Sequence, residues 1–307
     1  MKSKSTWTWG YFICAVALII MSFVISSEAL QEQKTSENSD IAYLTTDRQK
    51  GDEYSSALKE AWYAYNTANN PMAAKLFQEV LTADNANDAE RVQALFGLGV
   101  NSGYSIHSDQ QKAKQHFTQI VENYPQNPAA PWAMMELAYF EGTDTLQKRQ
   151  NARKYYLEII EKYPNSPAIH EATLRMASAY FFEIDPELNS NAVKTLEEHL
   201  KKHPDNPLAS TMRFRLAYWY EEVNRDYEKG LEHALVLGEL KMADPYRWPM
   251  QYWNIAQMYR IKFNKPAEAI KWYQKIIDES PRDYLVYAAK KFVEELSEDI
   301  KKNKTND

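Results

Sequence analysis

Between residues 54 and 302, apolar residues recur at the spacing of one face of an α-helix, and this pattern returns about every 39 residues. An alanine stands four residues before an aromatic residue or a leucine, which places both side chains on the same helix face. The pairs are Ala73/Phe77, Ala113/Phe117, Ala152/Tyr156, Ala192/Leu196 and Ala269/Tyr273, with Gly230/Ala234 as a degenerate copy. A fixed period of this size predicts a stack of repeats, because each unit buries its apolar face against its neighbours.

A second register predicts another helix before each of these pairs. A small residue recurs in it 39 or 40 residues apart. A small side chain at a fixed point lets two helices approach closely. These positions are Gly99, Ala138, Ala177, Ala217 and Ala256. We therefore predict units of two helices, A and B, that pack through small residues. The packing positions of helix B are Ala113, Ala152, Ala192 and Ala269.

Each predicted helix B ends in a repeated signal that stops one helix and starts the next. The segments are Tyr124-Pro125-Gln126-Asn127-Pro128, Tyr163-Pro164-Asn165-Ser166-Pro167 and His203-Pro204-Asp205-Asn206-Pro207, and Asp244-Pro245 repeats the last part. Proline cannot continue a helix, so the first proline ends helix B. The Asn or Ser is a good N-cap, and the second proline suits the first position of the next helix. Such short loops predict antiparallel neighbours.

In these registers the chain resembles the tetratricopeptide repeat family. The family pattern places a proline twelve residues after the helix B alanine, where Pro125, Pro164, Pro204 and Pro281 stand. The family repeat has about 34 residues, so the longer period implies extra residues in the turns. The resemblance implies an all-α, right-handed solenoid of about six helical hairpins over residues 54–302. A last amphipathic helix, roughly residues 282–302, would cap the stack.

A narrower resemblance concerns the segment that starts at Tyr163. Its sequence, Tyr-Pro-Asn-Ser-Pro-Ala-Ile-His-Glu-Ala and then Met-Ala-Ser-Ala-Tyr-Phe from Met176, is similar to repeats of exported bacterial envelope proteins. Examples of such proteins are the lipoprotein subunit of the outer-membrane assembly machine and the periplasmic coordinator that works with the Tol system. The resemblance implies a class of function only, an envelope scaffold that holds other proteins.

Residues 1–29 have the pattern of a signal peptide or a signal-anchor. Two lysines precede an apolar run at residues 11–25, and Ser27 and Ala29 fit a cleavage site. The run is short for a helix that must cross about 30 Å of hydrocarbon, which favours cleavage. A retained anchor at residues 10–27 and a buried cytosolic helix are the alternatives. If the segment is a cleaved signal peptide or a retained anchor, residues 30–307 are exported and are periplasmic or membrane-tethered.

The segments that flank the predicted repeats are polar. Residues 30–53 predict a flexible tether, and residues 303–307 predict a disordered tail. Cys14, the only cysteine, lies inside the apolar run, so the exported part has neither a disulfide nor a thiolate metal site. The net charge is −6 and no basic stripe is present, which disfavours nucleic acid as a partner.

The sequence contains no motif that predicts catalysis or a cofactor. Phosphate-binding glycine loops, nucleophile elbows and dinucleotide fingerprints are all missing. His199 and His203 have a spacing that can bind zinc. However, His203 takes the register of the tyrosines before the stop proline, and no third ligand is evident. We therefore interpret both histidines as structural and predict no catalytic, cofactor or metal residues.

These observations predict a non-catalytic scaffold or adaptor of the cell envelope that binds other proteins or peptide segments. The membrane would be contacted only through an uncleaved amino terminus. A groove for an extended peptide is predicted at Arg213, Tyr220, Tyr252 and Trp253. In the alternative interpretation, Tyr220 belongs to the core between repeats and Arg213 is a solvated charge. Two other functions stay open: a cell-wall or glycan-binding module, and a subunit that positions an envelope enzyme.

Overall fold

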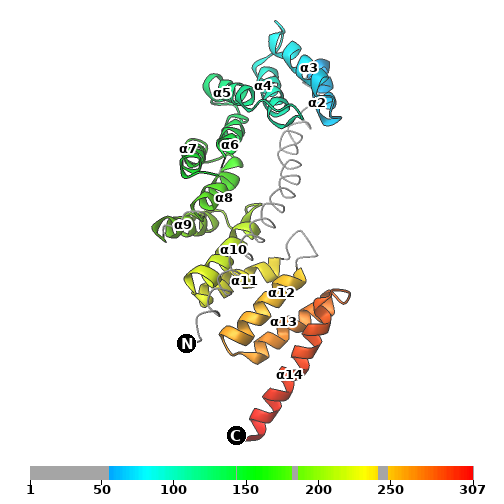
Figure 1. Cartoon of the computed structure of the whole chain (residues 1–307), viewed down its shortest axis with the longest axis vertical. Helices are drawn as coiled ribbons and strands as arrows, with labels where there is room; N and C mark the ends of the chain where they lie inside the picture. The colour runs from blue at the N-terminus through cyan, green and yellow to red at the C-terminus, as the bar shows by residue number, and fades with distance from the viewer. Residues whose placement is uncertain (1–54, 143, 182–185, 241–247, 307) are drawn as a thin grey trace, which may run out of the picture. The chain divides into compact units, whose positions relative to one another are not determined.

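The computed structural model describes residues 55–142, 144–181, 186–240 and 248–306, and all regular structure in these ranges is helical (Figure 1). The predicted signal segment 1–29, the tether 30–53 and the Asp244-Pro245 signal lie outside the described residues. Within the described ranges, none of the helices combines the length and the apolar character that a membrane span requires. The described residues divide into two compact units, with the boundary between Gly97 and Leu98.

The first unit holds α2 (Ser56–Asn66), α3 (Asn70–Thr82) and most of α4 (Asp88–Tyr104). Its core is built around the ring of Phe77, which is fully buried. A Cβ atom at Gly97 would lie 2.3 Å from that ring, so only glycine lets α4 approach it. Glu90 joins the start of α4 to α2, because its carboxylate accepts hydrogen bonds from the backbone N–H groups of Ser55 and Asn87.

The second unit continues with a run of helices that pack in chain order. They are α5 (Gln110–Asn123), α6 (Ala130–Glu141), α7 (Leu146–Lys162), α8 (Ala168–Phe181), α9 (Pro186–Lys202), α10 (Ala209–Tyr218), η2 (Trp219–Asn224), α11 (Tyr227–Leu240), α12 (Trp248–Gln257), η3 (Met258–Lys262), α13 (Pro266–Glu279) and α14 (Leu285–Asn306). The hairpins are α6/α7, α8/α9, α10/α11 and α12/α13. This arrangement confirms the predicted all-α fold of tandem helical hairpins.

The periodic residues that predicted the repeats are core residues. The alanines of helix B, Ala73, Ala113, Ala152, Ala192 and Ala269, are all buried, and so are the aromatic or leucine residues that follow them. On helix A, Gly99, Ala138, Ala177 and Ala256 are buried, whereas Ala217 is half-buried. Gly99 shows why the position is small: a Cβ atom there would lie 2.5 Å from the ring of Phe117. Small residues therefore set the distance between neighbouring helices.

The repeated stop signal works in part as predicted. α5 and α7 end immediately before Tyr124 and Tyr163, in front of the first proline of each signal. The second proline, however, precedes the next helix and is not its first residue, since α6 begins at Ala130 and α8 at Ala168. The Asn127 side chain instead accepts a hydrogen bond from the N–H of Ala129, and this turn leads the chain into α6.

Three helix ends differ from the sequence-based expectation. The A helices α10 and α12 finish in the π-helical segments η2 and η3, which are followed by Arg225 at φ 58° and Asn264 at φ 50°. At the carboxyl end, α14 extends to Asn306, so the segment expected to be a disordered tail from residue 303 is helical up to that point.

Candidate protein-interaction surface

The structure places exposed aromatic side chains at matching positions of two A helices in the second unit, α6 and α10. Tyr139 on α6 and Tyr218 on α10 each follow the small packing residue of their helix, and they are 41% and 40% exposed. Phe214 lies one helical turn before Tyr218 and is also exposed. Tyr104 of α4 contacts the rings of Tyr139 and Phe140. We name Tyr104, Tyr139, Phe214 and Tyr218 the aromatic row.

Charged side chains around the first half of the row are held by hydrogen bonds and ion pairs. The Tyr104 hydroxyl donates to Glu136, one turn before Tyr139 on α6. Burial and the Glu136 carboxylate raise the pKa of Tyr104 well above its usual range. On α8, Arg175 donates to Glu171 with 2.7 Å between Nε and Oε1. The rings of this surface are therefore bordered by positioned polar groups, as in the centre of many protein interfaces.

The predicted groove is not formed as expected, because Tyr220 and Tyr252 are core residues. They are 3% and 1% exposed, and their hydroxyls donate to Glu197 and Glu279 at 2.6 and 2.9 Å. Burial and these carboxylates raise the pKa of both tyrosines. Tyr220 also lies parallel to His233, with 5.9 Å between the ring centroids. Neither ring offers a face to a partner, so the alternative interpretation of Tyr220 as core is correct.

The other two residues of the predicted groove, Trp253 and Arg213, have different neighbours. Trp253 packs against Tyr273 and Phe292, with centroids 5.3 and 5.7 Å apart. Arg213 is half-buried and contributes, after burial, to the lowered pKa of His233. Tyr220 and Tyr252 themselves belong to separate core clusters, one with Leu216 and one with Tyr273. The four residues do not line a common groove.

The sequence did carry a signal for the aromatic row. Tyr220 comes three residues after Ala217, so it lies on the same buried face of the helix. Tyr218 comes one residue after Ala217, about 100° further round the helix, and is therefore turned outward. The same offset from Ala138 gives Tyr139. The small-residue register thus identifies Tyr139 and Tyr218, once their offset from it is considered, but not Tyr104 or Phe214.

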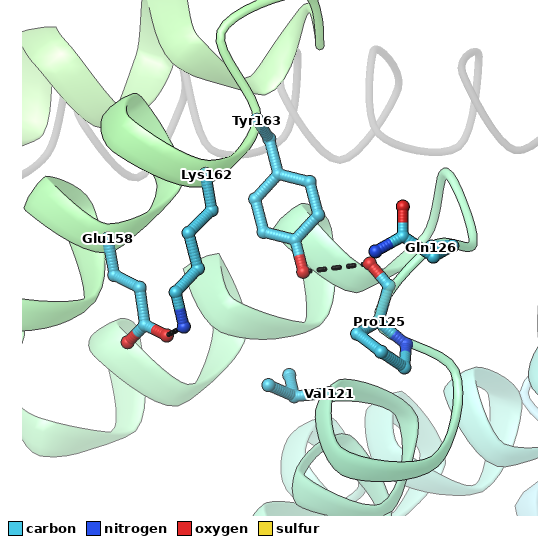
Figure 2. Close-up of a pocket in the computed structure, with 6 residues that line it drawn as sticks. All are labelled: Val121, Pro125, Gln126, Glu158, Lys162 and Tyr163. Atoms are coloured by element: carbon cyan, nitrogen blue, oxygen red, sulfur yellow. Dashed lines mark hydrogen bonds and ion pairs between the residues drawn. The ribbon is translucent and has the colours of Figure 1, made fainter.

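A shallow cavity of about 360 Å³ lies between the carboxyl ends of α5 and α7 (Figure 2). Its lining residues are Val121, Pro125, Gln126, Glu158, Lys162 and Tyr163. The Tyr163 hydroxyl donates to the Pro125 carbonyl at 2.9 Å, and Lys162 forms an ion pair with Glu158 (Figure 2). The Tyr163–Pro125 bond joins consecutive repeats, and the Lys162–Glu158 pair lies within α7, so we assign this cavity a structural role.

The histidines that the sequence singled out have an unexpected neighbour. His199 and His203 lie at the end of α9, and His170 from the first turn of α8 contacts both rings. The His170 Nδ1 atom is 2.9 Å from His199 Nε2. Nothing in the sequence indicates this neighbour, because residue 170 is far from residue 199 along the chain and only the packing of α8 on α9 brings the rings together.

Comparison with known proteins identifies two tetratricopeptide repeats, at residues 93–127 and 133–166. The first match covers the end of α4, all of α5 and the stop signal after it. The second covers most of α6, all of α7 and the following signal. No curated protein matches the chain. The two matched repeats carry Tyr104 and Tyr139, so the first half of the aromatic row belongs to segments of known repeat type.

Proposed function

We propose that this chain is a scaffold of the cell envelope that binds proteins or peptide segments through the aromatic row. Tetratricopeptide repeats generally serve protein–protein binding, and two of them are identified here. The observation that carries the proposal is the exposure of large aromatic side chains at equivalent positions of the A helices α6 and α10. Repetition of one contact type along a stack lets modest interactions add up over an extended partner.

The aromatic row has the properties of a binding surface rather than of accidental exposure. Aromatic rings bury much apolar area and lose little conformational entropy, which is why they dominate interface energetics. The Tyr104 ring is held in place by Tyr139, by Phe140 and by its hydrogen bond to Glu136, so it would lose little conformational entropy on binding. The polar border at Glu136 and Arg175 would meet backbone or charged groups of the partner.

The geometry favours a protein partner over a glycan. Sugar-binding surfaces present flat rings that lie in one plane, whereas Tyr104 and Tyr139 are inclined by 39° and pack against each other with 5.8 Å between their centroids. Such a pair forms an uneven apolar surface that suits side chains of a partner. The proposed role in the envelope rests on the signal-like pattern of residues 1–29, which predicts export of the repeat domain.

Site-specific photocrosslinking in cells tests this proposal. A photoreactive phenylalanine analogue would replace Tyr139 or Tyr218 in the row, and Leu157 as the control. Leu157 is 47% exposed but lies on helix B of the same hairpin as Tyr139. We expect discrete protein adducts at Tyr139 and Tyr218 and none at Leu157. Adducts of equal yield at Leu157, or a complete lack of adducts in the row, would reject the proposal.

A further inference from the structure

Three histidines meet where the start of α8 packs against the end of α9. His170 lies in the first turn of α8, His199 in the last turn of α9, and His203 directly after that helix. The ring centroids are 5.1 Å apart for His170 and His199, 5.3 Å for His170 and His203, and 4.8 Å for His199 and His203. The rings thus stand at the corners of a nearly equilateral triangle.

These separations are those of three imidazoles on one metal ion. Zinc binds imidazole nitrogen at about 2.0–2.1 Å with tetrahedral angles, which places two ligand nitrogens roughly 3.3 Å apart and two ring centres about 5 Å apart. The three observed centroid distances lie close to this separation of about 5 Å between ring centres. His170 Nδ1 and His199 Nε2 are already 2.9 Å apart. An opening of a few tenths of an ångström would admit the ion between these two nitrogens.

A hydroxyl group orients the central ring, as outer hydrogen bonds do in metal sites. Thr173 Oγ1 lies 3.2 Å from the other His199 nitrogen, Nδ1, and both side chains are buried, with 2% and 8% exposure. In the tautomer in which Nδ1 donates to this hydroxyl, the lone pair of Nε2 points to His170. Bonds of this kind fix the tautomer and the ring direction of histidine ligands.

The three rings would bind the metal as neutral imidazoles, which is the ligand form of histidine. His170 and His203 are half-buried, which leaves solvent access for a water ligand.

The third ring must turn before the site is complete. As they stand, no three His, Cys, Asp or Glu side chains among the described residues are arranged to hold a metal ion. His170 and His199 supply two converging nitrogens, and His203 lies beside both. A half-turn of the His203 ring about its Cβ–Cγ bond exchanges nitrogen and carbon positions and leaves the ring in its plane. Metal binding would select this orientation.

From this geometry we propose that His170, His199 and His203 bind one Zn²⁺ ion, with water as the fourth ligand. The ion would fasten the end of α9 to the start of α8. It would stabilise this hairpin by an amount that grows with the logarithm of the zinc concentration above the dissociation constant, because it binds the folded chain and not the unfolded one.

The repeat itself supplies a variant that removes one ligand and suits the fold. His203 stands in the register where the two preceding units have Tyr124 and Tyr163. In the unit before, the Tyr163 hydroxyl donates to the Pro125 carbonyl of its predecessor. His203→Tyr therefore restores the usual residue of the repeat, and we expect it to fold. His170→Gln removes a second ligand, and His107→Gln serves as the control because His107 is exposed in a turn.

Isothermal titration of the untagged, chelator-treated full chain with ZnCl₂ tests the proposal. We expect one Zn²⁺ per chain for the wild type and for His107→Gln. Loss of one of three ligands should weaken binding at least tenfold in His203→Tyr and in His170→Gln. With Co²⁺ in place of Zn²⁺, the wild type should show the intense visible absorption of four-coordinate cobalt, and His203→Tyr should not.

Two results would overturn the site. One is a wild-type chain that shows no saturable binding of Zn²⁺. The other is equal affinity in the wild type and in His203→Tyr, which would mean that the third imidazole does not coordinate. Thermal unfolding with and without ZnCl₂ provides an independent reading, because a bound ion must raise the midpoint of the wild type more than that of His203→Tyr.

Discussion

Gly99 and Gly230 form a matched pair of helical glycines for which the structure gives opposite expectations. A Cβ atom at Gly99 would lie 2.5, 2.7 and 2.9 Å from three atoms of the Phe117 ring. That ring cannot withdraw easily, since it is fully buried and stacks on Phe140. A Cβ atom at Gly230 would lie 3.4 Å from its nearest neighbours, the Ala217 carbonyl oxygen and the Glu221 nitrogen, which is ordinary contact.

The expected changes in the free energy of unfolding follow from two opposing terms. Replacing glycine by alanine inside a helix stabilises a protein by about 1 kcal/mol. At Gly230 this gain should be largely realised, so Gly230→Ala should stabilise the chain by roughly 0.5–1 kcal/mol. At Gly99 the displaced ring adds an overpacking cost of about 1–3 kcal/mol, which exceeds the gain in helix propensity, so Gly99→Ala should destabilise the chain by up to about 2 kcal/mol.

Urea unfolding of the full chain, followed by far-ultraviolet circular dichroism, measures both changes. A smaller side chain at position 117 should relieve the clash, so Phe117→Leu should cost less in the Gly99→Ala background than in the wild type. This coupling is read from a double-mutant cycle. A Gly99→Ala variant at least as stable as the wild type would refute the view that this glycine sets the distance between α4 and α5.

Three further outcomes are expected. A chain that ends after Leu240 exposes the apolar surface of α11 around Leu237, so it should aggregate, as measured by light scattering. A soluble fragment that unfolds cooperatively would contradict the role of the following helices as a cap. Burial and, to a smaller extent, the Arg213 charge lower the pKa of His233. In the folded chain His233 therefore binds protons less readily than in the unfolded chain, so the folded chain loses stability as pH falls below about 6.5. His233→Gln should therefore lose less stability between neutral and acidic pH than the wild type, and equal losses in urea titrations would refute this assignment. Mass spectrometry of the envelope-derived protein should find Leu30 at its amino terminus, whereas an intact Met1 start would indicate a retained anchor.

The fold could be predicted because its determinants are local. The spacing of Ala113 and Phe117 defines a helix face within one turn, and its recurrence defines the neighbours on which that face packs. The stop signals are equally local, since proline restricts only its own and the preceding residue. The same residues are found buried or at helix ends in the structure.

The features that escaped prediction depend on contacts between distant residues or on small rotations. His170 meets His199 only because α8 and α9 pack side by side. Tyr220 was assigned to a groove although its hydroxyl reaches the Glu197 carboxylate inside the core. The π-helical ends η2 and η3 have no simple periodic signal. Tyr220 in η2 is core, whereas Tyr218, two positions earlier at the end of α10, is on the surface. To tell the two apart, the orientation of the helix must be known.

Binding of the protein captured through the aromatic row tests the central claim most directly. Its dissociation constant would be measured for the wild type, for the double variant Tyr139→Ala/Tyr218→Ala and for Leu157→Ala. We predict that the double variant binds at least tenfold more weakly, a loss of about 1.4 kcal/mol or more, and that Leu157→Ala binds as the wild type does. Equal affinity of the double variant and the wild type would contradict the account of this chain as a scaffold that binds through its A helices.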